Sequence, residues 1–430
     1  MLLLLGAPLL SGAAMNTSLA KLKDNLIRAS QRLSTISSHD ALTILKSSVG
    51  APNLNYTLRS SPCTGNPILH TYDETLKLTI SEVTNVELSE TQWMQASLPV
   101  RMGGLGIRSV SVLAPSAYLA SAAGTRDLQD ALLSRSPAAL IYSDPDITTS
   151  LTVWSSLSNS IPPEGNLAFL QSSWDLPVCR NNFSSLVNTA TDPRDKARLL
   201  AVSAKHSSDW LNALPISACG LRMDDEAIRV SVGFRLGCKV CEPHTCPCGA
   251  LVDISGTHGM SCRQSAGRTS RHQLLNDIIF RAVNKAGVSA VKEPLGLYRT
   301  DGKRPDGLTR IPWDDGKCLT WDVTVSDTLA ASNLSVTSVS AGSAAEKSAT
   351  NKCRKYSELT ATYSFVPLAF ETLGPVNSTG ADFITSIGSR RRAISGETRE
   401  VMFLWQRLSI AVQRYNSVCL HGTLDTNLNS

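Results

Sequence analysis

Two aspartates in the segment KRPDGLTRIPWDDGKCLTWDVTV, residues 303–325, have the types and spacing of a divalent-cation site. Asp306 stands between a proline and a glycine, where a chain bends near the end of a strand. Asp322 lies in a run of alternating apolar and polar residues that predicts a β-strand. The turn residues 314–316 predict a hairpin that brings both carboxylates to one rim, an arrangement that suits Mg²⁺. A turn aspartate and an edge-strand aspartate in solvent would fit the same pattern.

A second candidate site lies in CKVCEPHTCPCGALVDISGTHGMSC, residues 238–262, which holds five of the eleven cysteines of the chain. Cysteine and histidine pairs at short spacing, with glycines for the turns between them, predict a tetrahedral Zn²⁺ site. The expected ligands are Cys246, Cys248, His258 and Cys262. Cys238, Cys241 and His244 lie close by in the sequence and could replace Cys248, and Cys241 is kept as the alternative ligand. Four protein ligands leave no open position on the metal, so the expected role of the zinc is structural.

Further charged and polar residues accompany the aspartate pair. They are Glu293 at the start of a predicted strand, Arg271 and His272 at the start of the helix before it, and Lys347, Lys352, Lys355 and Tyr356 on the helix expected after Asp322. Two acids and a lysine on one α/β sheet suit metal-dependent phosphodiester hydrolysis. In that reaction the metal activates a water molecule, and the lysine stabilises the developing charge.

The motif RPDG…WDVTV, with KCRKY downstream, resembles the restriction-like endonuclease domain of site-specific non-LTR retrotransposons, a PD-(D/E)xK nuclease. The order of a Cys/His knuckle, an Arg-His pair and this motif is similar to the order in those elements. The segment QASLPVRMGGLGIRS, residues 95–109, resembles the part that follows their reverse transcriptase palm. The resemblance covers nearly the whole chain and implies the C-terminal part of such a polyprotein.

The resemblance also implies roles for individual residues. Asp306 and Asp322 would bind a catalytic Mg²⁺, Lys352 or Lys355 would be the catalytic lysine, and Glu293 is expected at the same catalytic site. The wider superfamily has a lysine two residues after the second acid, where this chain has Thr324, but the nucleases of these elements also supply a lysine from the next helix. The residues expected to contact DNA are Arg271, His272, Arg304, Tyr356, Arg390, Arg391 and Arg392.

The paired acids Asp224 and Asp225 do not fit a polymerase palm. A palm holds its metal-binding aspartates in a tight hairpin between apolar strands, whereas here Ile228, Val232 and Leu236 follow at helical spacing. The two aspartates are therefore predicted to begin a helix, where they satisfy free amides. No reverse transcriptase activity is expected from this chain.

Periodicity divides the chain into a helical first half and an α/β second part. The expected fold class is multidomain: a mostly α-helical N-terminal half, a small zinc knuckle, and an α/β restriction-endonuclease-like C-terminal domain with a central mixed sheet. The expected domains are a helical thumb-like remnant of reverse transcriptase at 1–105, a helical linker at 106–237, the knuckle at 238–264, the endonuclease at 265–400, and a C-terminal helix and tail at 401–430. The leucine-rich segment 1–14 is expected to form a buried helix of the thumb-like region.

The composition is that of a globular, mildly basic chain, with 42% hydrophobic residues, 18% charged residues and a formal net charge of +5. This charge is compatible with DNA, and with element RNA, as partners. The apolar start of the chain and the Asn-x-Ser/Thr sequons would suit secretion. Clustered cysteines, however, are unlike a disulfide framework, and the start lacks the positive charge of a signal peptide. A nuclear or cytoplasmic location is therefore expected, with no membrane association, and secretion is not.

Together these patterns predict a metal-dependent DNA endonuclease that nicks a target site, with a catalytic Mg²⁺, a structural Zn²⁺ and no polymerase palm. A catalytically inactive nucleic-acid-binding remnant of a transposon is the alternative from a different class. A secreted glycoprotein is a minor alternative.

Overall fold

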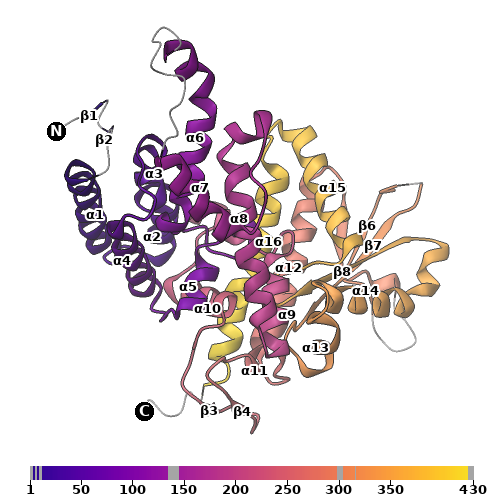
Figure 1. The fold of residues 1–430 in the computed structure, drawn as a ribbon. Coiled ribbons are helices and arrows are strands. Elements are labelled where there is room, and N and C mark those ends of the chain that lie inside the picture. The colour runs from indigo at the N-terminus through magenta and orange to yellow at the C-terminus, as the bar shows by residue number, and fades with distance from the viewer. Residues whose placement is uncertain are drawn as a thin grey trace. The chain divides into compact units, whose positions relative to one another are not determined.

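The computed structural model of the chain describes residues 3–4, 7–8, 12–133, 145–297, 304–314 and 316–424. The chain folds into two compact units, Met1–Thr189 and Ala190–Ser430 (Figure 1). The boundary between the units falls inside the range 106–237, which the sequence assigns to a linker. Within the described ranges, no helix is long and apolar enough to cross a membrane.

The first unit is almost entirely helical. Its helices are α1 (Ala13–Leu33), α2 (Ser38–Ile44), α3 (Ala51–Ser60), α4 (Pro67–Thr84), α5 (Glu90–Ala96), α6 (Val110–Leu133), α7 (Pro145–Ser158) and α8 (Gln171–Thr189), with short helical turns at Leu45–Val49, Val100–Met102 and Gly165–Phe169. Helix α1 buries one stripe at helical spacing, formed by Met15, Leu19, Leu26 and Leu33, and packs against α4. Helix α6 packs against α3 and α4 and also against α7 and α8, so it joins the helices on both sides of the expected boundary at residue 105.

The expected helix over residues 1–14 is wrong at the described residues Leu3–Leu4 and Ala7–Pro8. Leu3–Leu4 (β1) and Ala7–Pro8 (β2) form a short antiparallel pair, and the first helix begins at Ala13. Pro8 explains part of this difference, because proline in a helix interior removes a hydrogen bond and clashes with the preceding turn. Ala7 is nevertheless buried, and the Pro8 carbonyl accepts a hydrogen bond of 2.6 Å from Ser61.

The second unit combines helices with two small sheets. Its helices are α9 (Pro193–Ser203), α10 (Asp225–Leu236), α11 (His258–Ser261), α12 (Ala266–Lys285), α13 (Ala331–Thr337), α14 (Ser343–Lys355), α15 (Ser378–Ser395) and α16 (Glu400–His421), with short 3-10 turns at Asp209–Asn212, Ser217–Cys219, Leu295–Leu297 and Ser357–Ala361. Its strands are β3 (His244–Thr245), β4 (Leu251–Val252), β5 (Ala290–Lys292), β6 (Gly307–Thr309), β7 (Leu319–Ser326) and β8 (Ser364–Glu371).

The larger sheet has four strands in the order β5-β6-β7-β8. The first two pairings are antiparallel and β7 pairs in parallel with β8, so the sheet is mixed, as expected. Strands β6 and β7 form the hairpin that the sequence predicts. A parallel pair needs a crossover, and the helical segment that contains α13 and α14 provides it.

Alternate residues of the central strands face two different layers. Trp321 and Val323 on β7 pack with Leu368 and Phe370 on β8 against the apolar faces of α12, α15 and α16. On the opposite face, Ala369 packs against small residues of α14. Helix α16 contacts α12, α15 and α10, so the helix of the segment that the sequence sets apart shares the core of this unit (Figure 1).

The prediction that Asp224 and Asp225 begin a helix is confirmed. Asp224 is the N-cap of α10, and its carboxylate accepts a hydrogen bond of 2.7 Å from the Ala227 amide. Ile228, Val232 and Leu236 are buried along that helix. The two acids therefore lie at a helix end and not in a hairpin between strands.

Candidate metal centre and acidic site

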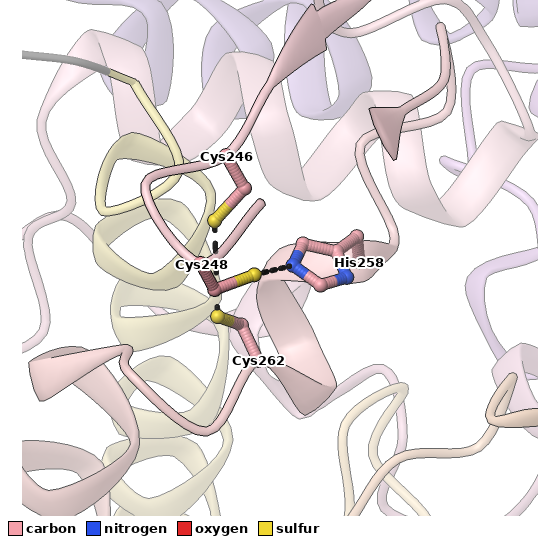
Figure 2. Close-up of side chains that lie close together, drawn as sticks. All are labelled: Cys246, Cys248, His258 and Cys262. Atoms are coloured by element: carbon pink, nitrogen blue, oxygen red, sulfur yellow. Dashed lines mark hydrogen bonds between the residues drawn. The ribbon is translucent and has the colours of Figure 1, made fainter. Parts of the chain in front are cut away.

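Four metal-binding side chains converge in the segment between α10 and α12 (Figure 2). The Sγ atoms of Cys246, Cys248 and Cys262 and one imidazole nitrogen of His258 all lie within 4.8 Å of one another. The Sγ atoms of Cys246 and Cys262 are 3.8 Å apart, and Cys248 Sγ is 3.2 Å from His258 Nε2. Zn–S bonds of about 2.3 Å place two tetrahedral thiolates about 3.8 Å apart, so these side chains could bind a metal such as zinc.

The local chain conformation explains this convergence. Cys246 and Cys248 stand in the turn of the β3–β4 hairpin, where Gly249 adopts a φ of 86° that favours glycine. His258 begins the single-turn helix α11, and Cys262 is the C-cap of that helix. One helical turn brings residues four apart to the same side, so both halves of the set are built from short-range geometry.

Two thiols of the cluster have pKa values shifted in opposite directions. A hydrogen bond from the Ala250 amide, with help from the Cys246 thiol, lowers the pKa of Cys248 to about 7. Burial raises the pKa of Cys246 to about 11. A thiolate is the form that binds metal, so one ligand of the cluster is already ionised in part at neutral pH and the metal must displace a proton from another.

The alternative ligands have other partners. The Cys241 thiol donates to the Asp253 carbonyl at 3.2 Å and lies outside the converging set of ligand atoms. His244 Nε2 is 2.9 Å from the Thr423 hydroxyl, and His244 Nδ1 is 2.8 Å from the Glu242 carbonyl. The ligand set that the sequence favours is thus the one that the structure brings together.

The metal-binding segment packs closely on the end of α16. A Cβ atom at Gly259 would lie 2.6 Å from the Cys419 carbonyl oxygen, and one at Gly256 would lie 2.6 Å from a Leu420 methyl group. Contacts that short require backbone or core side chains to move. The two glycines therefore let the knuckle and the C-terminal helix share one packed interface within the second unit.

The two aspartates of the hairpin lie on neighbouring strands of the mixed sheet. Asp306 directly precedes β6, and its amide donates to the Trp321 carbonyl at 2.9 Å. Asp322 is the next residue along β7. Gly307 completes the close approach, because a Cβ atom there would lie 2.0 Å from the Trp321 ring. The small glycine after the Pro-Asp pair therefore lets the two acid-bearing strands pack over the indole.

Helix α12 holds Asp306 from one side. His272 Nε2 lies 3.0 Å from Asp306 Oδ2 and 3.1 Å from the Val323 carbonyl. Both partners are acceptors, so Nε2 carries the hydrogen in this arrangement. The Val323 amide also donates to Asp306 Oδ2 at 2.6 Å. The hydrogen bond to Asp306 raises the pKa of His272, so the histidine favours its charged form beside the carboxylate.

Helix α14 holds Asp322 from the other side. The Lys352 ammonium forms an ion pair with Asp322 Oδ2, and the Tyr356 hydroxyl lies 2.9 Å from Asp322 Oδ1. Asp322 is 3% exposed. Burial raises the pKa of Asp322, and the charge of Asp306 raises it further, whereas Lys352 lowers it. The Asp322 carboxylate is therefore a buried group that depends on nearby positive charge.

Lys355 and Glu293 lie at the edge of this arrangement. Lys355 Nζ donates to the Tyr356 hydroxyl at 2.8 Å, so it reaches Asp322 through the tyrosine, whereas Lys352 contacts the acid directly. Glu293 follows β5, and its amide donates to the Asp306 carbonyl at 3.0 Å. The Glu293 carboxylate forms an ion pair with Arg304, and its side chain is 60% exposed.

Several residues expected to contact DNA have partners inside the protein instead. Arg271 is 1% exposed and donates to Asn416 at 2.7 Å, and Tyr356 is fully buried beside Asp322. Neither side chain extends from the surface in this conformation, so an exposed surface contact with DNA is not available to either of them. Arg391 forms an ion pair with Glu400 in which both side chains are 12% exposed.

The other two arginines of the triple are accessible. Arg390 stacks on the Trp313 ring, with 4.1 Å between the guanidinium carbon and the ring centroid, and it also donates to the Trp313 carbonyl. Arg392 is exposed on α15. Of the three arginines, Arg390 and Arg392 therefore have the exposed positions that the expected contact with phosphate requires.

Asn276 is a site residue that sequence analysis missed. Its Oδ1 accepts from the Trp321 indole at 2.9 Å, and its Nδ2 donates to the Asp306 carbonyl at 3.2 Å. It thereby fixes Asp306, just before β6, and Trp321, on β7, to helix α12. A single asparagine four residues after His272 carries no motif, although the spacing places both side chains on one face of the helix.

Comparisons with known proteins add no family to these observations. No protein-family model matches the chain, and no similar sequence is found among curated proteins. The functional assignment therefore depends on the site residues themselves.

Proposed function

We propose that this chain is a metal-dependent DNA endonuclease of the restriction-like type that site-specific non-LTR retrotransposons carry, with a structural zinc knuckle and no polymerase palm. The observation that carries the proposal is the position of Asp306 and Asp322 on adjacent segments of one mixed sheet, with Lys352 of helix α14 paired to Asp322. Helices on both faces of that sheet, as the resemblance implies, support a restriction-endonuclease-like fold for the second unit.

The acidic site fits a hard divalent cation such as Mg²⁺. Asp306 and Asp322 offer carboxylate oxygens, and the raised pKa of the buried Asp322 reflects a demand for positive charge nearby. In the described part of the chain, the Cys/His cluster is the one group of three or more converging ligands. Mg²⁺ at the acidic site would thus rely on two carboxylates with water and phosphate oxygens. When bound, it would supply an activated water and neutralise phosphoryl charge.

The residues of the chain would have distinct tasks at this site. His272 and the Val323 amide orient the Asp306 carboxylate, and Tyr356 orients Asp322. The Lys352 ammonium lies close enough to Asp322 to stabilise negative charge that develops on a phosphate beside it. Lys352 is therefore our choice for the catalytic lysine, and Lys355 would position Tyr356.

Nicking of supercoiled plasmid by the purified chain tests the proposal. We expect Mg²⁺-dependent conversion to the open circular form that stops in EDTA and falls about a hundredfold or more in Asp306→Asn and Asp322→Asn. Asp277→Asn, an acid on helix α12 that forms ion pairs with Arg281 and Lys292, is the matched control and should nick normally. Equal nicking by Asp306→Asn and the unchanged chain would reject the proposal.

A nucleic-acid-binding remnant without catalysis remains the second candidate. The observation that favours it is the Lys352–Asp322 ion pair, which neutralises the buried acid without any metal. Duplex binding by the purified chain together with no Mg²⁺-dependent nicking would select this candidate.

Template-directed DNA synthesis is not expected from either candidate, because Asp224 and Asp225 begin helix α10. Primer extension on an RNA template with Mg²⁺ and deoxynucleotides tests this expectation. Extended product above a control without protein would contradict it.

A further inference from the structure

A polar cavity of about 430 Å³ lies beside the acidic site in the second unit. Its walls come from the end of the knuckle, the first turns of α12 and the end of β7. The lining residues include Arg263, Ser265, Arg268, Arg271, His272 and Thr324. His272 belongs to both the cavity and the acidic site, because it lines the cavity and its imidazole contacts Asp306.

Two buried polar atoms on residues that line this cavity have no hydrogen-bond partner. They are the Ser265 hydroxyl and Nε of Arg271, on side chains of residues that are 6% and 1% exposed. Ser265 is the N-cap of the 20-residue helix α12, yet its side chain caps no amide. A buried polar atom left without a partner destabilises the folded chain, so a ligand that reached either atom would gain from the hydrogen bond it supplies.

The charge of the cavity is positive. Arg263, Arg268 and Arg271 line it together with the start of α12, which carries the positive end of the helix dipole. Arg268 is fixed in place, because its guanidinium donates to the Ser261 and Cys262 carbonyls at 3.1 and 3.2 Å. The carboxylate of Asp327 interacts electrostatically with Arg268 and Arg271. Burial raises the pKa of Asp327, and its carboxylate accepts hydrogen bonds from the Leu329 amide and the Thr372 hydroxyl.

We propose that this cavity binds a phosphodiester of the DNA backbone, close to the phosphate that the acidic site would cleave. The proposal rests on the proposed endonuclease function and adds a positioning site to it. Arginines, a free hydroxyl and a helix N-terminus are the groups that bind phosphate oxygens. Because His272 separates the cavity from Asp306, a backbone held there would pass directly over the acids. Arg271 would then contact phosphate from within the cavity, and not as the exposed surface residue that its sequence position suggested.

Duplex binding measured without cleavage tests the cavity. The probe is a fluorescein-labelled DNA duplex in Mg²⁺-free buffer with zinc present, followed by anisotropy over a series of salt concentrations. For Arg263→Gln/Arg268→Gln we expect weaker binding and a slope of log affinity against log salt that is smaller by about two, one for each lost phosphate contact. Arg281→Gln, on the exposed part of the same helix, is the matched control and should change the slope by less than about one.

Two further variants keep the test independent of folding. Arg263 is exposed, so Arg263→Gln alone should fold, keep its zinc and reduce the slope by about one. Ser265→Ala should weaken duplex binding with the slope unchanged, because it removes a neutral donor. An unchanged affinity and slope in the double variant, or an equal effect of Arg281→Gln, would overturn the proposal.

Inorganic phosphate distinguishes a free anion from a DNA backbone. If phosphate raises the melting temperature of the unchanged chain but not of the double variant, while both bind duplex equally, the assignment to DNA is wrong. The nicking assay separates this inference from the proposed function. If the double variant has the same salt slope as the unchanged chain and the unchanged chain nicks plasmid, the cavity proposal alone is rejected. If the double variant has the smaller slope and the unchanged chain does not nick, the endonuclease proposal alone is rejected.

Discussion

Lys352 on α14 forms an ion pair with Asp322 on β7, and the carboxylate of this aspartate is almost completely buried. Tyr356, one helical turn after Lys352, lies 2.9 Å from the other carboxylate oxygen. One end of the crossover helix thus fixes both oxygens of the acid on the central strand. The charge of Asp322 and the position of α14 are coupled by this contact.

Replacing Lys352 with methionine should destabilise the second unit. A buried carboxylate without its cationic partner costs roughly 3 kcal/mol in the free energy of unfolding. The cost should shrink at acidic pH. Without the lysine, the pKa of Asp322 in the folded state rises further above its ordinary value of 3.8, so the neutral acid predominates at low pH and needs no partner. Urea unfolding at several pH values measures the difference, which should grow as pH rises from about 4 towards neutrality.

Lys355→Met is the control for this experiment, since Lys355 contacts Tyr356 and not the acid. It should change the free energy of unfolding by less than about 1 kcal/mol. Nicking should fall about a hundredfold in Lys352→Met and much less in Lys355→Met. An equal loss of nicking in both variants would contradict our choice of catalytic lysine.

Removal of metal from the Cys/His cluster should loosen helix α16. Cys246→Ser takes away one buried ligand, and because the knuckle packs on Cys419 and Leu420, the change should reach the core of the unit. We expect loss of bound zinc and a free energy of unfolding lower by on the order of 5 kcal/mol. Zinc content and hydrogen exchange of the α16 amides measure the two effects. Cys241→Ser is the matched control, and loss of zinc in this variant would place Cys241 among the ligands.

Local sequence signals predicted the parts of the molecule that depend on short-range geometry. The four side chains that could bind a metal come from a hairpin turn and one helical turn, so short-range geometry accounts for the pairs Cys246–Cys248 and His258–Cys262. The Asp306–Asp322 pairing follows from a hairpin whose turn and strand residues are adjacent in the chain.

Burial of polar side chains could not be predicted in the same way. An arginine such as Arg271 is a residue type that often contacts DNA. Its hydrogen-bond partner Asn416, however, is 145 residues away in the sequence, so its burial could not be predicted from neighbouring residues. Tyr356 likewise is buried by the strand that carries Asp322. The division of the chain near Thr189 also differs from the expected boundaries. Helix α6 packs on α3 and α4 across the expected boundary at residue 105, and such long-range contacts leave no signal in the composition of the sequence.

Metal binding by the cluster should become more sensitive to pH below about 7. The metal-free cluster holds a proton on Cys246, whose pKa is about 11, throughout the neutral range. Cys248, whose pKa is about 7, binds a further proton only as pH falls through that value. Protons compete with the metal for each thiolate, so the slope of log affinity against pH should increase by about one below pH 7. Competition with a chromophoric chelator between pH 6 and 8 measures it. A constant slope over this range would show that Cys248 does not titrate there.

The last prediction concerns Asp73 in the first unit, which fastens α4 to the start of α6. Its buried carboxylate accepts from the Ser109 hydroxyl and the Val110 amide, both at 2.7 Å, and from the amide and hydroxyl of Ser111. Asp73→Ala would leave these donors without their acceptor, so we expect a loss of about 3 kcal/mol in the free energy of unfolding. Asp24→Ala, on the exposed face of α1, should cost less than about 0.5 kcal/mol. Denaturant unfolding of both variants measures the difference. Similar stability of Asp73→Ala and Asp24→Ala would mean that water replaces the carboxylate and that this junction is open to solvent.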